Sequence, residues 1–204
     1  MTLQSPCPRL ILASQSPARA ALLTAAGLRF ETRPARIDEA EIKRSARAEG
    51  NSADNTALLL AELKAHRIAR TNPDALIIAA DQLLVCEDRW FDKPADLAEA
   101  AAQLRALRGH THTLVTAVLC QRGEQRLWHH IARPRLTMRK FSDAFLHAYL
   151  AEEGTVLTTT VGSYRLEGRG AQLFDSVVGE HAAVLGLPLL PLLGFLRQHR
   201  VLID

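Results

Sequence analysis

The sequence has few cysteines, few aromatic residues and no long apolar run. Its three cysteines are far apart and form no C-x-x-C pair, which argues against a disulfide framework or a zinc ribbon and favours a reducing compartment. Aromatic residues make up 5% of the chain, so platforms for stacking nucleic-acid bases are scarce. No apolar run approaches the length of a transmembrane helix. We therefore expect a cytoplasmic protein that binds neither nucleic acid nor a membrane.

The common catalytic motifs are also missing. There is no G-x-x-x-x-G-K-[ST] phosphate loop and no G-x-S-x-G nucleophile elbow. Gly168 and Gly170 begin a G-x-G pattern that lacks the third glycine and the preceding apolar strand of a dinucleotide site. His110 and His112 have the spacing of a strand metal pair, but no third ligand stands nearby, which favours ordinary roles for both.

The composition supports one folded domain over residues 1–204, with two lobes. Apolar residues make up 48% of the 204 residues, enough for a substantial core. The net charge of +3 suits an anionic ligand but is too small for a nucleic-acid surface. Strand and helix patterns alternate and hairpins interrupt them, which predicts the α/β class with a mixed sheet. Residues 133–140 predict a strand at a sheet edge, 173–177 a short helix and 183–186 a last strand.

Turn and capping residues mark further boundaries. Residues 87–89 predict a hairpin turn, and the predicted helix N-caps are Ser52 or Asn51, Asp96 and Ser142.

The stretch near the N-terminus has the pattern of an anion site. Residues 10–13 read as a short strand, and Ser14 begins a polar turn before a helix. Ser16 suits the N-cap and Pro17 the first helical position, so free backbone N–H groups and the helix dipole point at the turn. Arg19 adds positive charge in the first helical turn. The alternative is an ordinary helix cap with a solvated arginine.

Two charged residues stand in apolar surroundings. Lys64 falls on the apolar stripe of a predicted helix. Two hypotheses are open: its amine reaches water while its stem packs, or it points into a cleft. Residues 75–80 form a continuous apolar run that predicts a buried strand ending at Asp81. An acid there is costly unless it is paired or bound to a metal. A metal or catalytic role and a structural hydrogen-bonding role are both open for Asp81.

Together these residues have the chemistry that polyphosphate hydrolysis needs. Lysine and arginine bind phosphate oxygens, carboxylates hold a divalent metal, and one carboxylate activates water. Oxygen ligands without histidine or cysteine suit Mg²⁺ or Mn²⁺. The candidate residues are Ser14, Ser16, Arg19, Glu39, Lys64, Asp81, Lys93 and Glu167.

An ordered series of motifs resembles the Maf family of nucleoside triphosphate pyrophosphatases over nearly the full chain. The motifs are LILASQSPARAALL (10–23), IDE (37–39), LAELKA (60–65), IIAADQLLV (77–85), DKP (92–94), GHTHTLVTAV (109–118), YRLEGRGAQLF (164–174) and VLGLPLLPLL (184–193). The resemblance implies hydrolysis between the α and β phosphates, a divalent metal, and a homodimer. It also implies a mixed, twisted sheet flanked by helices around a central cleft. In matching positions, the triphosphate would be held by Ser14, Ser16, Arg19, Lys64 and Lys93, and the metal by Glu39 and Asp81, with Asp81 also the water-activating base.

Three departures from the family pattern bear on specificity. Ala18 replaces the first arginine of an S-P-R-R motif, Gln82 stands where many members have threonine, and Glu167 where many have glutamine. These variants resemble the branch that acts on 7-methyl-GTP, which makes Gln82 and Glu167 substrate-binding candidates. A carboxylate near the base favours a positively charged purine or one that offers amino donors. The competing hypothesis is a nucleotide-binding regulator of cell division or septum formation without significant turnover, which need not keep the acids and lysines together.

Overall fold

The computed structural model describes residues 3–203, and residues 1, 2 and 204 of the predicted domain lie outside this range. The strands are β1 (Leu10–Leu12), β2 (Glu31–Thr32), β3 (Leu76–Cys86), β4 (Arg89–Phe91), β5 (Thr111–Arg122), β6 (Gln125–Ala132), β7 (Arg135–Met138) and β8 (Phe174–Val178). The α-helices are α1 (Pro17–Ala25), α2 (Glu39–Ala48), α3 (Ala53–Ala69), α4 (Leu97–Leu107), α5 (Asp143–Glu153), α6 (His181–Val184) and α7 (Leu189–Gln198). Three short 3₁₀ helices are η1 (Gly154–Thr159), η2 (Val161–Ser163) and η3 (Arg169–Leu173). None of the described helices combines the length and the apolar character needed to cross a membrane.

The chain divides into two compact units. Unit 1 comprises Met1–Gln82, Thr116–Ala132 and Glu180–Asp204, and unit 2 comprises Leu83–Val115 and Arg133–Gly179. Strands β3 and β5 contribute residues to both units. Parallel and antiparallel pairs occur together, so the predicted α/β class with a mixed sheet flanked by helices is confirmed.

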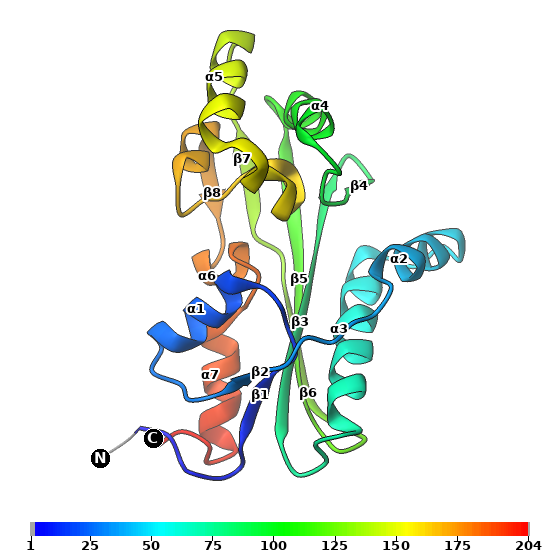
Figure 1. Ribbon diagram of the computed structural model, residues 1–204, viewed down its shortest axis with the longest axis vertical. Helices are drawn as coiled ribbons and strands as arrows, with labels where there is room; N and C mark the ends of the chain where they lie inside the picture. Colours follow the sequence, from blue (N-terminus) through cyan, green and yellow to red (C-terminus); the bar gives the residue numbers. More distant parts are fainter. Residues whose placement is uncertain (1–2, 204) are drawn as a thin grey trace. The chain divides into compact units, whose positions relative to one another are not determined.

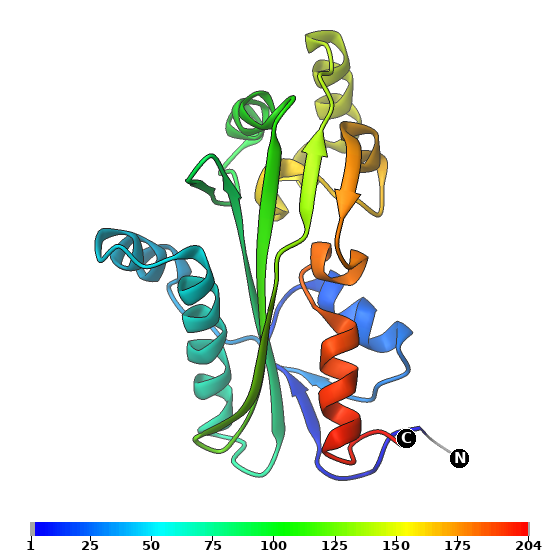
Figure 2. The same cartoon turned by 180° about the vertical axis from the view of Figure 1, so that it is seen from behind.

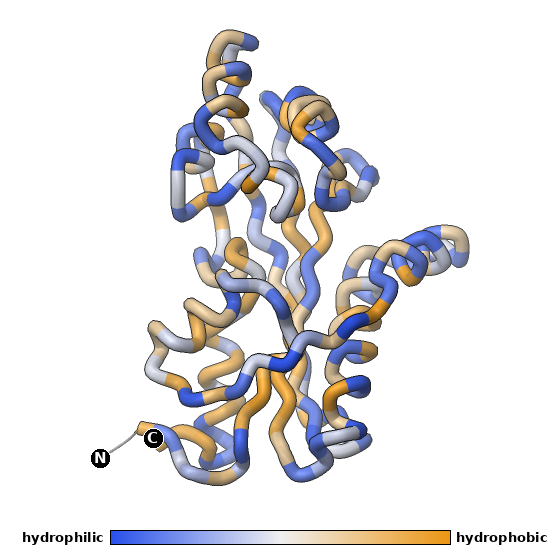
Figure 3. Tube along the Cα trace, viewed as in Figure 1, coloured by the Kyte–Doolittle hydropathy of each residue, from blue (hydrophilic) through white to orange (hydrophobic). Residues whose placement is uncertain are grey.

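In unit 1, β1 lies between β2 and β3 and is parallel to both. Ile11 pairs with Glu31 on one side and with Ile77 on the other. Strand β6 returns antiparallel along β5. Figure 3 shows β1 and the first part of β3 as hydrophobic segments. Such continuous apolar strands are expected where helices cover both faces of a parallel sheet.

Side chains alternate between the two faces of this sheet and meet a different helix layer on each. Leu10, Leu12 and Ile78 pack in a core with residues of α1 and α7. Ile11 and Ile77 pack on the opposite face with residues of α3. Figures 1 and 2 show α1 and α7 on one side of β1 and β3, and α3 on the other. The helices of unit 1 therefore bury both faces of its parallel strands.

Unit 2 is built on hairpins and short helices. The predicted hairpin at residues 87–89 is confirmed, since β3 and β4 pair antiparallel and Glu87 and Asp88 both have positive φ at the turn. Strand β7 lies between β5 and β8. Helices α4 and α5 begin at the N-caps Asp96 and Ser142, as the sequence predicts.

Four local predictions are wrong. Strand β3 does not end at Asp81 but continues to Cys86, because a polar side chain does not interrupt the backbone ladder when its charge is paired. Strand β7 is not at an edge, because β8 pairs with it, and β8 replaces most of the predicted helix over 173–177. The predicted strand over 183–186 is replaced by α6, a single helical turn that Gly186 closes with a φ of 97°.

Candidate active site

The candidate residues of unit 1 gather where the chain changes direction in the sheet. After β1 the chain leads through α1 to β2 on one side, and then through α2 and α3 to β3 on the other side. Ligands of open α/β sheets bind outside the carboxyl ends of the strands at such a switch point. Ser14 follows β1 here, and the N–H of Ala13 donates to the carbonyl of Ile78 (2.8 Å), which extends the β1–β3 pairing toward Asp81.

Lys64 binds two carboxylates at this point. It lies on the buried face of α3, its side chain is 8% exposed, and its Nζ donates to Asp81 Oδ1. The same Nζ is 2.7 Å from Oε1 of Glu39, the first residue of α2. Of the two hypotheses for Lys64, the solvated amine is therefore wrong. The lysine points inward and joins Glu39 and Asp81 into one cluster.

The second carboxylate oxygen of Asp81 is the most informative atom of the cluster. Oδ2 is buried, and within residues 3–203 it has no hydrogen-bond partner. Burying such an oxygen costs free energy unless a ligand or water completes it. Mg²⁺ is often held by one or two carboxylates together with substrate phosphates and water. No group of three His, Cys, Asp or Glu side chains among the described residues could hold a metal alone. Glu39 and Asp81 therefore fit a metal that takes its other ligands from substrate and water.

The predicted anion turn after β1 has the expected local structure. Ser16 is the N-cap of α1, its Oγ accepts from the N–H of Arg19 (3.4 Å), and Pro17 opens the helix. Ser14 is buried, and its Oγ accepts from the N–H of Ser16 (3.1 Å). The serine hydroxyls thus fix the turn, and the N-terminus of α1 presents its positive end there.

Arg19 has a second task that the sequence does not reveal. Its Nε donates to the carbonyl of Gly186 (2.7 Å), and its Nη1 donates to the carbonyl of Ala80 (2.8 Å) and to Ser14 Oγ (3.3 Å). Burial lowers the pKa of the guanidinium, and the negative charges of Asp81 and Glu39 act in the opposite direction. The alternative of a solvated arginine is therefore wrong.

Gln82 follows Asp81 on β3 and points to the opposite face of the sheet. Its Nε2 lies within hydrogen-bond distance of Thr116 Oγ1 (2.8 Å) and of the carbonyls of Ala183 (3.0 Å) and Val184 (3.2 Å). Carbonyl oxygens can only accept, so these contacts place the amide nitrogen toward α6. The side-chain oxygen of Gln82 therefore lies on the other side of the amide, away from these acceptors.

The other two candidates, Lys93 and Glu167, belong to unit 2. Lys93 follows β4 and Glu167 precedes η3, and both are exposed. Exposure leaves the ammonium and the carboxylate available to a ligand. Their substrate contacts stay predictions.

Sequence reasoning missed two residues that hold the site in shape. Thr116 on β5 accepts from Gln82 and donates from its Oγ1 to the carbonyl of Ala183 (3.0 Å). A Cβ at Gly186 would lie 3.2 Å from Nε of Arg19, so this glycine lets the guanidinium approach the backbone. The only sequence signal for either residue was Gly186 itself, a glycine that stands just before Leu187 and Pro188.

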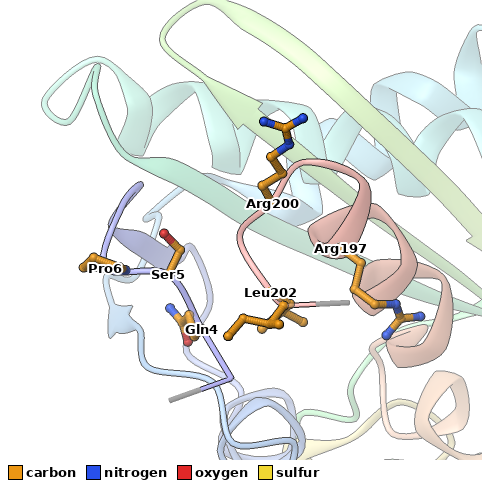
Figure 4. A pocket seen from close by; sticks show the side chains of 7 residues that line it. Gln4, Ser5, Pro6, Arg197, Arg200 and Leu202 are labelled. Atoms are coloured by element: carbon orange, nitrogen blue, oxygen red, sulfur yellow. The ribbon is translucent and has the colours of Figure 1, made fainter. Parts of the chain in front are cut away.

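A surface pocket elsewhere in unit 1 contains none of the predicted residues. It lies between the N-terminal segment and the end of α7, and Figure 4 shows its lining: Gln4, Ser5, Pro6, Arg197, Arg200 and Leu202, together with Ile203. Gln4 forms two hydrogen bonds with the backbone of Arg29, and Ser5 donates from its N–H to the carbonyl of Val201. The surroundings of this pocket are explained by the packing of the two chain ends, and we assign it no part in the chemistry.

The fold and the cluster define an α/β protein with a lysine-bridged pair of carboxylates beside the N-terminus of helix α1. The chain belongs to the family described as Maf-like protein, whose model matches residues 9–199. The predicted family membership is confirmed.

Several curated relatives are similar over almost their whole length. A nucleoside triphosphate pyrophosphatase of Granulibacter bethesdensis is 56% identical, over 95% of this chain and 98% of the relative. A protein of the same name from Rhodospirillum rubrum is 50% identical, over 97% of this chain and 98% of the relative. A 7-methyl-GTP pyrophosphatase of Rhizobium meliloti is 46% identical, over 94% of this chain and 96% of the relative.

Proposed function

We propose that this protein hydrolyses nucleoside triphosphates between the α and β phosphates, releasing the nucleoside monophosphate and pyrophosphate. The observation that carries the proposal is the contact of one buried lysine with Glu39 and Asp81 beside the N-terminus of α1. Family membership and the names of the relatives support it. The cellular role would be removal of modified or non-canonical nucleotides.

The triphosphate would be bound at the turn after β1. Backbone N–H groups at the start of α1 and the helix dipole attract phosphate oxygens. Arg19 adds a guanidinium whose Nε and Nη1 already bind carbonyls, so Nη2 is the nitrogen that would contact phosphate. Lys64 and Lys93 would supply further positive charge, as the family resemblance implies. This arrangement favours a ligand with several negative charges over a monophosphate.

Asp81 is the proposed general base. Its Oδ1 is held by Lys64 while Oδ2 has no partner among the described residues, so Oδ2 is the atom that would accept a proton from the attacking water. A divalent ion, Mg²⁺ or Mn²⁺, would be held by Glu39 and by Oδ1 of Asp81, so that Oδ2 stays available to accept the proton, and the ion would neutralise phosphate charge. Lys64 keeps the two carboxylates together and prevents their mutual repulsion from separating them.

For the base, we propose a preference that includes 7-methyl-GTP. Methylation at N7 gives guanine a positive charge, which the exposed carboxylate of Glu167 would attract. The side-chain oxygen of Gln82 would accept from an amino donor, since its nitrogen is held by α6. The name of the Rhizobium meliloti relative supports this substrate, and that of the Granulibacter relative supports the broader class.

The decisive experiment measures pyrophosphate release from a panel of canonical, non-canonical and methylated nucleoside triphosphates. Each nucleotide is assayed with Mg²⁺, with Mn²⁺ and with a chelator, and the Asp81→Asn variant serves as the inactive reference. We expect metal-dependent release of pyrophosphate together with the monophosphate. Release of inorganic phosphate with the nucleoside diphosphate would contradict cleavage between the α and β phosphates. Equal pyrophosphate release with the metals and with the chelator would contradict metal binding by Glu39 and Asp81.

The regulator without turnover is not favoured, because Glu39, Lys64 and Asp81 form an intact cluster. Tight nucleotide binding with no product from any member of the panel would support it.

We also propose that the protein works in the cytoplasm as a homodimer, as the family resemblance implies. Sedimentation equilibrium of the purified chain tests the dimer, and fractionation of cells tests the location.

A further inference from the structure

The loop that carries Glu167 is folded back on itself. The N–H of Gly168 donates to the carbonyl of Arg165 (3.2 Å), and the N–H of Ala171 donates to the carbonyl of Gly168 (3.1 Å). A Cβ at Gly170 would lie 2.4 Å from the carbonyl oxygen of Arg165, a distance that no side chain tolerates. Residues 165–170, here called the Glu167 loop, therefore close tightly, with Glu167 exposed near their middle.

A buried carboxylate holds this loop from both sides of Glu167. Glu153, the last residue of α5, has a side chain that is 2% exposed. Its Oε2 is 3.5 Å from Nη2 of Arg165, and its Oε1 is 3.3 Å from Nη1 of Arg169. Each oxygen thus binds a different arginine, one before and one after Glu167. A buried carboxylate without such partners is costly, so these contacts tie the fold of the loop to the end of α5.

Two aromatic residues hold the chain just before the loop. Tyr164 is buried, and its hydroxyl is 2.8 Å from Nε2 of His112 on β5. The hydroxyl of Tyr149 on α5 donates to the carbonyl of Ser163 (3.4 Å). The chain just before the loop is therefore fixed by contacts that do not involve Glu153, whereas Glu153 acts on the loop itself.

We propose that Glu153 is a specificity-determining positioning residue, because its carboxylate binds Arg165 and Arg169 and thereby fixes the loop that presents Glu167 to the base. This rests on the proposed function, in which Glu167 attracts a positively charged purine. Glu153 itself is buried and touches no substrate. Its loss should release the loop and weaken discrimination between bases more than it weakens hydrolysis itself.

The neighbouring residue offers a matched control. Glu152 has the same carboxylate and binds Arg169 as well, with Oε2 3.3 Å from Nη2, but its side chain is 63% exposed. An exposed ion pair contributes little to order. Glu153→Gln and Glu152→Gln therefore make the same chemical change next to the same loop, one buried and one in water.

The first test needs no substrate. Amide hydrogen exchange of residues 165–171 is measured by mass spectrometry in the wild type, E153Q and E152Q. We expect E153Q to exchange about tenfold faster in this segment, since local opening becomes easier, and E152Q to match the wild type. Equal exchange in all three proteins would overturn the proposal. If E153Q does not fold, Arg165→Gln removes the same contact from the loop side, and wild-type exchange in R165Q would also overturn it.

The second test measures kcat/KM for 7-methyl-GTP and for GTP in the wild type, E153Q, E167Q and the double variant. If Glu167 provides about tenfold discrimination through a charged contact, E167Q should lose it, and E153Q should lose most of it. The double variant should discriminate no worse than E167Q, because both changes remove the same contact. Loss in E167Q with full discrimination in E153Q would overturn the positioning role. Full discrimination in E167Q would instead overturn the proposed contact of Glu167 with the base. The exchange experiment would then still test whether Glu153 holds the Glu167 loop in place.

Discussion

The ammonium group of Lys64 and the carboxylate of Asp81 form an ion pair that is almost entirely buried, with the two side chains 8% and 4% exposed. The two residues come from α3 and β3, so the pair links a helix to the strand that it covers. Neither charge has access to bulk water, and Lys64 has a second carboxylate partner in Glu39. Stability and chemistry at this site are therefore coupled.

Lys64→Met should destabilise the fold strongly. Removing one partner of a buried pair leaves an uncompensated charge and costs about 3–5 kcal/mol in the free energy of unfolding. Urea denaturation at pH 7.5 measures the change. Arg67→Met, on the exposed part of the same helix, is the control and should change stability by less than about 0.5 kcal/mol. The double variant K64M/D81N should recover part of the loss, and a double variant no more stable than K64M would contradict the coupling.

Asp81→Asn should abolish turnover while the protein stays folded, because Lys64 keeps Glu39 as a counter-charge. The amide cannot accept the proton of the attacking water, and general-base catalysis contributes about 10²–10⁴-fold to rates. Pyrophosphate release under saturating nucleotide measures kcat, and circular dichroism verifies the fold. Asp74→Asn, exposed before β3, is the matched control and should keep wild-type activity. A D81N variant with near-wild-type kcat would assign the base to another residue.

Gly186→Ala should damage the site through Arg19. At Gly186 φ is 97° and a Cβ would lie 3.2 Å from Nε of Arg19, so the variant suffers both backbone strain and a crowded guanidinium. Gly27 has a φ of 76° with nothing within 4 Å of its Cβ, so Gly27→Ala carries the backbone strain alone. We expect both variants to lose about 1 kcal/mol of stability or more, and only G186A to raise KM for the nucleotide. Equal KM values for G186A and G27A would contradict a role of Arg19 in phosphate binding.

Stability should decrease between neutral and mildly acidic pH because of His112. Burial lowers the pKa of this imidazole from 6.5 to about 4. Between these values the unfolded chain takes up a proton that the folded protein does not, so stability falls as pH falls from 6.5 toward 4, by about 2 kcal/mol at pH 5. His112→Gln cannot be protonated and should flatten this slope in urea denaturation at pH 7.5 and 5, whereas His66→Gln, exposed on α3, should not. A wild-type slope in H112Q would assign the acid sensitivity to other groups.

Much of the fold could be predicted from local patterns, whereas the continuation of β3 past Asp81 depends on the ion pair with Lys64. The hairpin at residues 87–89 and the N-caps Ser16, Ser52, Asp96 and Ser142 follow from turn and capping chemistry within a few residues. Other errors concern short segments such as β8 and α6, whose own sequence fits more than one structure. For β8 the decision comes from pairing with β7, a contact between residues far apart in the chain.

For the candidate site, residue types could be predicted better than their contacts. An acid after an apolar strand indicated a charge that needs a partner, a lysine on an apolar stripe left open whether its amine is solvated, and the structure joins the two. The pattern could not show that Glu39 shares the same lysine, because that contact depends on how α2 meets α3. The hydrogen bonds of Arg19 to the carbonyls of Ala80 and Gly186 could likewise not be predicted, because every residue has a backbone carbonyl and residue type does not identify the acceptor.

These backbone contacts of Arg19 affect how related chains should be compared. The guanidinium connects segments that are 61 and 167 residues away from it in the chain, so the arginine contributes to the packing of this fold whether or not the protein hydrolyses anything. Retention of an arginine at this position is therefore poor grounds for calling a relative active. A chain that has lost its chemistry while keeping its architecture would be recognised instead by neutral side chains at positions 64 and 81 together.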